Sequence, residues 1–453
     1  MKGLPTIVRR LVPILALAAL LLVPAVDRAG APAHPGRSYA EHVPCPPGLA
    51  QPWQCSIVSV RLDRSGRVRG RVHLAVALLH RPGPPRPAVL ALAGGPGAAA
   101  LPGAKGFARI LAPLLTNRDL LVVDQRGTGA SDPIACPQIE ADETWSAAAV
   151  TACAQQLGPA GAFYSTDASV GDLETVRHML AIPALTVYGV SYGTKVAVDY
   201  ARAHPKAVDG LVLDSPIVED TDPFYRRSAN GAQRVLENLC AENACVAHAD
   251  PGADLRTLVG MMRGGVLTRR GVSVSEGSLL HAIVAGGPRL HALPPALHTA
   301  TGGDLRPLAA LLPRQVPDAR DPSGWLAPSD SSTVYLATSC EDGDFPWAQS
   351  ETQGQRLASA EAYLDRLGDR AFAPFDRYAG EQYGEARICA PWPEAGRRPA
   401  PAPLPDVPAL LLVGGDDDLA PLEGAKEIAA QLPHSRLVVV PDSGHGVLHG
   451  TAG

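Results

Sequence analysis

The stretch LTVYGVSYGTKVAVDYARAHP, residues 185–205, places Ser191 in the pattern Gly-x-Ser-x-Gly. Gly189 and Gly193 would let the backbone turn sharply and would keep side chains away from an exposed serine hydroxyl. A serine hydroxyl is a weak nucleophile unless a neighbouring base takes its proton. The spacing alone is weak evidence in a chain with 45 glycines, so the hypothesis requires a histidine and a carboxylate elsewhere in the sequence.

Both partners are found near the carboxyl end of the chain. The segment RLVVVPDSGHG puts His445 in a loop after an apolar run, and ALLLVGGDDDLAP puts three aspartates after the preceding run. Its place at the strand end and a following proline favour Asp417 as the carboxylate that orients the base. Asp416 and Asp418 remain alternatives, as does His449 for the base. The order serine, aspartate, histidine is the one an α/β-hydrolase requires.

Backbone N–H groups that could stabilise a developing oxyanion follow two of the apolar runs. The Tyr192 amide comes directly after the proposed nucleophile, and the turn GGPG can supply a second N–H from Gly95. Pro96 has no N–H to offer. On its own, GGPG indicates only a tight turn. It becomes a candidate oxyanion donor only because Ser191 is a candidate nucleophile.

The elements that must position these residues alternate along the chain. The apolar runs in PAVLALAGGPG, DLLVVDQRGTGASD, LTVYGVS and VDGLVLDSP are separated by helical patterns such as AKGFARILAPLL and DASVGDLETVRHMLA. We expect Asp167 or Ser169 to cap the second of these helices. Strands that are apolar throughout indicate a mostly parallel sheet covered by helices on both faces. The sequence therefore predicts an α/β fold of the α/β-hydrolase type.

The same reading divides the chain into five parts. Between about 217 and 402 the strand–helix rhythm gives way to helical segments, proline-rich joints and acidic and aromatic clusters, which predicts an inserted, largely helical cap domain. The predicted organisation is a signal peptide at 1–33, an N-terminal extension with a β-hairpin at 34–85, a core in two parts at 86–216 and 403–453, and the cap at 217–402.

The first 33 residues have the pattern of an export signal. A cationic start precedes the 16-residue apolar run LVPILALAALLLVPAV and then small residues, which predicts cleavage after Ala33. The run is shorter than the roughly 20 residues that a membrane span needs, and it contains Pro13 and Pro24. We therefore expect a secreted protein with no stable membrane association after cleavage.

The cysteines agree with export, because an even number outside the cytoplasm normally forms disulfides. Nearest-neighbour pairing is the simplest of many possible connectivities for Cys45, Cys55, Cys136, Cys153, Cys240, Cys245, Cys340 and Cys389. The chain has no C-x-x-C pair and no histidine cluster with ligand spacing, so neither a metal nor a cofactor is expected. With a net charge of −5 and dispersed Lys and Arg residues, a nucleic-acid partner is not expected either.

Together the motifs resemble the secreted tripeptidyl-aminopeptidase-like branch of the prolyl aminopeptidase group. The resemblance rests on LAGGPG, VVDQRGTGASD, YSTDASVGDLETVRHMLAIPALTVYGVSYGT, LLLVGGDDDLAP and SGHG, with cysteine segments that include SCEDGD and RICAPWP. It favours pairing Cys340 with Cys389. It implies an exopeptidase that removes short N-terminal peptides or single residues through a serine acyl-enzyme, and we expect a monomer acting on a peptide or small ester.

An aminopeptidase must also hold a substrate ammonium group, for which carboxylates of the cap are suitable. Glu341 is the first candidate and Glu219 the next; the remaining candidates are Asp220, Asp222, Asp342 and Asp344. A secreted carboxylesterase or lipase with the same three catalytic residues is the competing enzyme. A catalytically silent binding protein on the same fold would have lost one of those residues, whereas this sequence contains all three.

Overall fold

The computed structural model describes residues 39–80, 83–141, 145–218, 222–241, 245, 250–287, 289–312, 330–393, 395–396 and 402–450. The predicted signal peptide at 1–33 lies outside these residues, as does Glu219. Within the described part of the chain, no helix is both long enough and apolar enough to cross a membrane.

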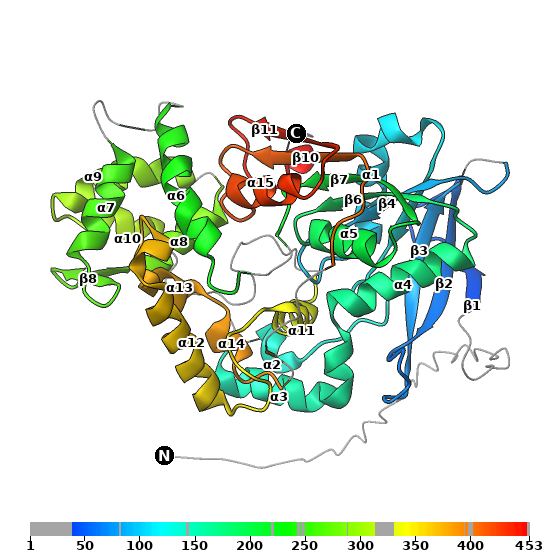
Figure 1. Cartoon of the computed structure of the whole chain (residues 1–453), viewed down its shortest axis with the longest axis horizontal. Helices are drawn as coiled ribbons and strands as arrows, with labels where there is room; N and C mark the ends of the chain where they lie inside the picture. The colour runs from blue at the N-terminus through cyan, green and yellow to red at the C-terminus, as the bar shows by residue number, and fades with distance from the viewer. Residues whose placement is uncertain are drawn as a thin grey trace, which may run out of the picture. The chain divides into compact units, whose positions relative to one another are not determined.

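A nine-stranded sheet forms the centre of the molecule, with the strand order β1-β2-β3-β5-β4-β6-β7-β10-β11 (Figure 1). Strands β1 to β3 are antiparallel, and the pairs from β5 to β11 are parallel. The strands are β1 Tyr39–Val43, β2 Trp53–Arg61, β3 Arg71–Leu79, β4 Ala88–Leu92, β5 Asp119–Val123, β6 Leu185–Val190, β7 Val208–Asp214, β10 Ala409–Gly414 and β11 Ser435–Val440. The predicted α/β fold class is confirmed by this mostly parallel sheet.

Successive strand residues point to opposite faces of the sheet. Because both sets of side chains are apolar in the central strands, helices cover both faces. In β4, Leu90 packs in one apolar cluster with residues of α4 (Thr166–Met179) and α5 (Tyr192–Ala203). Its neighbour Val89 packs in the other cluster, against Phe107 of α1 (Ala104–Ile110). All five residues of β4 and of β5 are buried, which explains their uninterrupted apolar runs.

Helix α4 begins earlier than the sequence suggested. Ser165 is its cap, and the Ser165 hydroxyl accepts a hydrogen bond from the Ala168 N–H. The expectation of Asp167 or Ser169 at this place was wrong, since both lie inside the first turn. The earlier start makes Thr166 the first helical residue, and its N–H therefore faces outward from the helix end.

A buried ion pair fastens α4 to the loop that follows β5. The Arg126 guanidinium donates two hydrogen bonds of 2.8 Å to the Asp172 carboxylate. The Arg126 Nη1 group donates to the carbonyls of Leu62 and Phe163, so the buried cation makes four hydrogen bonds to protein. This contact fixes the N-terminal half of α4 next to the strand ends.

The chain between β7 and β10 is largely helical, as the sequence predicted for this stretch. Its elements are α6 Arg226–Leu239, α7 Pro251–Met261, β8 Val266–Arg269, β9 Val272–Ser275, α8 Glu276–Ala285, α9 Leu293–Thr301, α10 Arg306–Leu311, α11 Ser332–Asp342, α12 Gln353–Leu367, α13 Arg377–Tyr383 and α14 Ala386–Cys389. Figure 1 shows α6 to α10 gathered on the side away from β1 to β3, while α11 lies near α2 (Pro137–Ala141).

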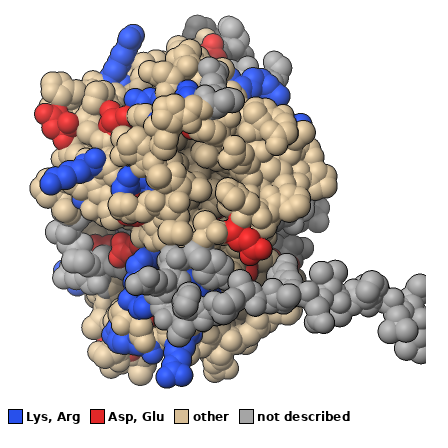
Figure 2. All heavy atoms as spheres, turned by 90° about the vertical axis from the view of Figure 1, so that its right-hand side faces the viewer, with Lys and Arg blue, Asp and Glu red and all other residues tan. Residues whose placement is uncertain are grey.

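The surface on the β1 to β3 side carries scattered charge. Figure 2 shows Lys and Arg side chains standing apart from one another there, between larger areas of uncharged surface. A continuous basic band, which a phosphate backbone would need, is not formed by the described residues on this face.

Candidate active site

Ser191 occupies the sharp turn between β6 and α5. Its backbone has φ 55° and ψ −128°, a conformation that side-chain-bearing residues rarely adopt. The Ser191 N–H donates to the Asp214 carbonyl over 2.9 Å, which holds the turn at the carboxyl edge of the sheet. Strained backbone of this kind concentrates at functional sites, where the surrounding structure enforces it.

The two glycines of the motif are required by close packing. A Cβ added at Gly189 would lie 2.3 Å from the Gly193 carbonyl oxygen, and one at Gly193 would lie 2.6 Å from the Leu92 carbonyl oxygen. Both distances are far below van der Waals contact, so any side chain would push α5 away from the strands. The turn that presents Ser191 therefore depends on glycine at both positions.

Asp417 and His445 are brought into contact by the loops that follow β10 and β11. The His445 Nδ1 lies 2.9 Å from Asp417 Oδ2, and both side chains are buried. Asp417 Oδ1 also accepts hydrogen bonds from the N–H groups of Leu419 and Ala420, which fix the carboxylate plane. The geometry holds the imidazole in one orientation, as an orienting carboxylate does in a serine hydrolase.

The alternatives considered for the carboxylate and the base have other surroundings. Asp416 accepts a hydrogen bond from the Asn238 side chain. Asp418 is buried, and burial raises the pKa of its carboxyl well above the ordinary value. The His449 ring packs edge-on against Phe107, with 5.7 Å between ring centroids. Asp417 and His445 are the pair that makes the contact.

The loop that carries His445 is held by residues that the sequence analysis did not single out. The Asp214 carboxylate, at the end of β7, accepts from the N–H groups of Val447 and Leu448 over 2.8 and 3.0 Å. The neighbouring Ser215 hydroxyl accepts from the Gly446 N–H over 2.8 Å. Burial raises the pKa of Asp214. The signal for both was an aspartate and a serine directly after the apolar run in VLDSP.

The loop that carries His445 also lies against the Ser191 turn. A Cβ added at Gly446 would be 3.9 Å from a methyl carbon of Val190, the residue before Ser191. On the other side, a Cβ at Gly94 would be 3.0 Å from the Ser191 Cβ. The loop GGPG therefore reaches the serine directly, with Gly95 at φ 102°. Tyr192 begins α5, so its N–H is one of the free amides at a helix N-terminus.

Three of the carboxylates considered for the substrate amine form hydrogen bonds within the protein. Glu341 is buried, and its Oε1 accepts a hydrogen bond of 2.7 Å from the Trp392 indole. Asp222 accepts from the N–H of Arg227, and Asp342 accepts from Thr166. Asp344 is exposed. Asp220, like Glu219, falls outside the described residues.

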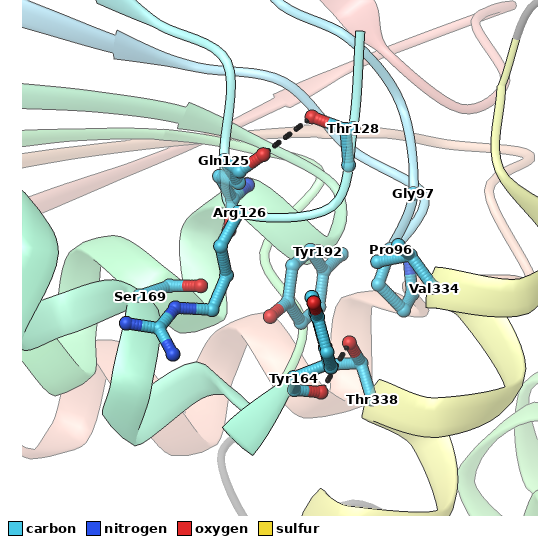
Figure 3. Close-up of a pocket in the computed structure, with 10 residues that line it drawn as sticks. All are labelled: Pro96, Gly97, Gln125, Arg126, Thr128, Tyr164, Ser169, Tyr192, Val334 and Thr338. Atoms are coloured by element: carbon cyan, nitrogen blue, oxygen red, sulfur yellow. Dashed lines mark hydrogen bonds between the residues drawn. The ribbon is translucent and has the colours of Figure 1, made fainter. Parts of the chain in front are cut away.

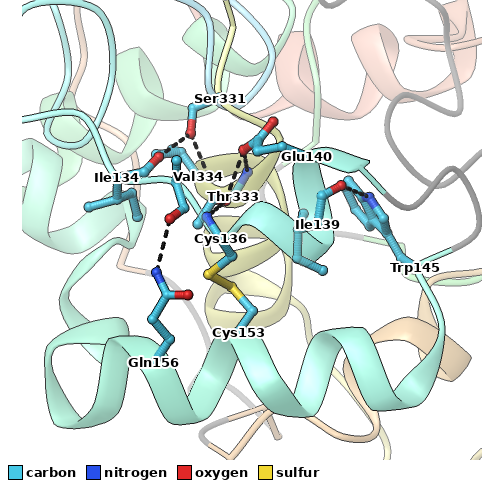
Figure 4. The surroundings of a disulfide bond; sticks show 11 residues. Ile134, Cys136, Ile139, Glu140, Trp145, Cys153, Gln156, Ser331, Thr333 and Val334 are labelled. Carbon is cyan, nitrogen blue, oxygen red and sulfur yellow. Dashed lines mark hydrogen bonds between the residues drawn. A yellow bond between two sulfur atoms is a disulfide. The ribbon is translucent and has the colours of Figure 1, made fainter. Parts of the chain in front are cut away.

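The cysteines form nearest-neighbour disulfides, which join Cys45 to Cys55, Cys136 to Cys153, Cys240 to Cys245 and Cys340 to Cys389. Figure 4 shows Cys136, beside α2, bridged to Cys153 of α3 (Ala147–Leu157). In the described part of the chain, no group of three or more His, Cys, Asp and Glu side chains has a metal-binding arrangement.

Two family models match the chain. The alpha/beta hydrolase fold model covers residues 87–244, and a model described as TAP-like protein covers residues 374–452. The tripeptidyl aminopeptidase of Streptomyces lividans is 24% identical over 88% of this chain and 79% of its own length. The proline iminopeptidase of Neisseria gonorrhoeae is 32% identical over 32% of this chain and 38% of its own length.

Among the solved structures similar to this chain is an alpha/beta hydrolase enzyme from a Medee basin deep-sea metagenome library. The match covers 84% of this chain and 90% of the other, with 12% identity and a TM-score of 0.37.

The sheet and the first family match define the chain as an α/β-hydrolase. The second match and the curated relatives support the tripeptidyl-aminopeptidase-like branch of this fold and an aminopeptidase-like serine hydrolase.

Proposed function

We propose that the protein is a secreted exopeptidase that releases short peptides or single residues from the N-termini of its substrates. Ser191 is the nucleophile, His445 the general base and Asp417 the carboxylate that orients it. The observation that carries the proposal is the buried contact of 2.9 Å between His445 Nδ1 and Asp417, on loops packed against the Ser191 turn. The disulfides support an extracellular location, where such bonds persist.

In this mechanism Asp417 keeps the His445 proton on Nδ1, which leaves Nε2 to accept the Ser191 proton. The Ser191 Oγ then forms a bond to the scissile carbonyl carbon, and the carbonyl electrons move to its oxygen. The N–H groups of Tyr192 and Gly95 stabilise that oxyanion. As the C–N bond breaks, His445 returns the proton to the leaving amine. Water then repeats the sequence on the acyl-enzyme and releases the peptide acid.

The segment 217–402 is proposed to act as a lid over the substrate. In an open α/β sheet, ligands bind at the carboxyl ends of the strands, and Ser191, Asp417 and His445 all follow such ends. An inserted segment placed between β7 and β10 would limit access to chain ends and so favour exopeptidase cleavage. It would also supply the carboxylate that binds the substrate ammonium.

A three-substrate comparison tests the function. We expect hydrolysis of a free-amine tripeptide chromogenic substrate, with much slower cleavage of the same peptide after N-acetylation, and a short acyl ester serves as the third substrate. Ser191→Ala should lower the rate on every substrate by at least about a thousandfold and abolish fluorophosphonate labelling. Equal rates on the free and acetylated peptides would contradict the aminopeptidase proposal, and efficient turnover of the ester alone would identify an esterase.

A further inference from the structure

Helix α11 contacts the GGPG loop directly and is linked to Tyr192 through the first turn of α4. At its N-terminal end, the Ser331 N–H donates to the Gly97 carbonyl over 3.1 Å. A Cβ added at Gly97 would lie 2.4 Å from the Ser331 carbonyl oxygen, so the GGPG loop is pressed directly onto this helix end. At its C-terminal end, Asp342 binds the first turn of α4.

A chain of hydrogen bonds runs from Asp342 to Tyr192. The Asp342 carboxylate accepts from both the N–H and the hydroxyl of Thr166. The Thr166 Oγ1 lies 2.7 Å from the Tyr192 hydroxyl. Because the Thr166 hydroxyl proton is donated to the carboxylate, Thr166 accepts from the Tyr192 O–H, so every bond in the chain has a defined direction.

The surroundings keep this chain in place. Tyr192 and Thr166 are buried, and burial raises the pKa of the Tyr192 phenol well above its ordinary value, which keeps the phenol a donor. Burial would lower the pKa of Lys195, but the carboxylates of Asp342 and Asp199 outweigh this effect and raise it. The Lys195 ammonium therefore balances the negative charge at the end of the chain.

Between Ser331 and Asp342, helix α11 is itself held to the core by several hydrogen bonds and a disulfide. The Thr333 hydroxyl donates to Glu140 and accepts from the Cys136 N–H, while the Ser331 hydroxyl donates to the Ile134 carbonyl (Figure 4). Further along, the Thr338 hydroxyl donates to the Tyr164 carbonyl. The Cys340–Cys389 bridge joins the last turns of the helix to α14. These contacts make α11 a rigid support.

The space between the support and the two donors is small. Figure 3 shows Tyr192 facing Pro96 and Gly97, with Val334 and Thr338 of α11 beside them. The cavity that these residues enclose has a volume of about 10 Å³, which is the size of one water molecule.

We propose that the Tyr192–Thr166–Asp342 chain is a positioning device that holds the Tyr192 amide in the geometry needed to stabilise the oxyanion. Thr166 and Asp342 touch neither substrate nor nucleophile; they act through the side chain of the residue whose N–H does. The inference rests on the proposed serine mechanism, and it adds residues from α4 and α11 to the determinants of the acylation rate.

The test removes the central hydroxyl. Thr166→Val keeps the shape and should lower kcat by about ten- to a hundredfold, because one oxyanion donor is misplaced but not deleted, with KM changed by less than about threefold. The rate of fluorophosphonate labelling should fall by the same factor, since the tetrahedral phosphorus adduct uses the same donors. Thr166→Ser restores the hydroxyl and should recover most of both rates. Tyr192→Phe, which deletes only the phenolic oxygen, should reproduce the loss.

Thr186→Val is the matched control, because it removes the hydroxyl hydrogen bond of another buried threonine, to Asp209, at the end of β6 away from Ser191. It should lower thermal stability as much as Thr166→Val does, with kcat within about twofold of the parent. Unchanged kcat in both Thr166→Val and Tyr192→Phe would overturn the inference, as would equal kcat losses in Thr166→Val and Thr186→Val. Persistent labelling of Ser191→Ala would instead refute the serine mechanism itself, so the two failures are distinguishable.

Discussion

At the residue scale, the loop GGDDD places three carboxylates side by side, and their surroundings give them different tasks. Asp417 accepts hydrogen bonds from two backbone N–H groups and contacts His445. Asp416 is tied to Asn238, and Asp418 is buried beside them. Chemical identity alone could not distinguish the three, but their hydrogen-bond partners do.

Substitution of each aspartate by asparagine tests this difference. Asp417→Asn should lower kcat by about a thousandfold or more, because the amide would favour the wrong His445 tautomer. Asp418→Asn should leave kcat within about threefold, since burial already favours the neutral acid and an amide has nearly the same shape. Steady-state rates on one peptide substrate measure both. A loss at position 416 or 418 that matches the loss at 417 would contradict the assignment.

At the element scale, the sequence predicted best those candidate site residues that come directly after a strand. Ser191, Asp417 and His445 each come directly after an apolar run, and parallel strands bring such ends to one edge. The alternation of runs and helical patterns was therefore enough to predict the mostly parallel sheet. These features are local in the sequence, or follow from one rule of topology.

The supporting contacts could not be predicted in the same way. Asp214 binds Val447, and Asp342 binds Thr166, across separations of 233 and 176 residues. No spacing rule relates such partners, because they are set by how the layers pack. The cap of α4 was also misplaced, since Ser165, Asp167 and Ser169 are all good cap residues and only the packed helix selects one.

Helix α8 carries a carboxyl group whose burial predicts a pH effect on stability. Burial raises the pKa of Glu276 from 4.5 to about 7. Its Oε2 accepts from the Asp376 N–H, and its Oε1 has no hydrogen-bond partner among the described residues. Between these two pH values the native state binds more protons than the unfolded chain does, so the group costs stability as the pH rises.

Glu276→Gln removes this cost. The difference in unfolding free energy between the variant and the parent should grow by about 2–3 kcal/mol in favour of the variant as the pH is raised from about 5 to about 8. Denaturant unfolding at both pH values measures the change. Glu361→Gln, at an exposed position of α12, is the control and should show no such trend. A parallel pH response of the two variants would show that Glu276 does not titrate as its burial implies.

At the scale of the whole molecule, four disulfide bridges link residues that are 5 to 49 positions apart in the sequence. We expect the mature protein to contain no free thiol, with each bridge contributing about 2–4 kcal/mol to stability. Alkylation of the denatured, unreduced protein should therefore leave its mass unchanged, whereas alkylation after reduction should label eight cysteines. Two or more labelled thiols without reductant would remove this expectation.

The bridge between Cys340 and Cys389 has a practical consequence for how the protein is produced. It lies at the end of α11 that carries Asp342, yet far along the chain from Ser191. In a reducing bacterial cytosol this bridge would stay open, while the sheet and the Ser191 turn could still form. Recombinant material of that kind would pass a solubility screen and an assay of secondary structure, and then turn over substrate slowly. An oxidising host compartment is therefore the appropriate choice before any substrate library is judged inactive.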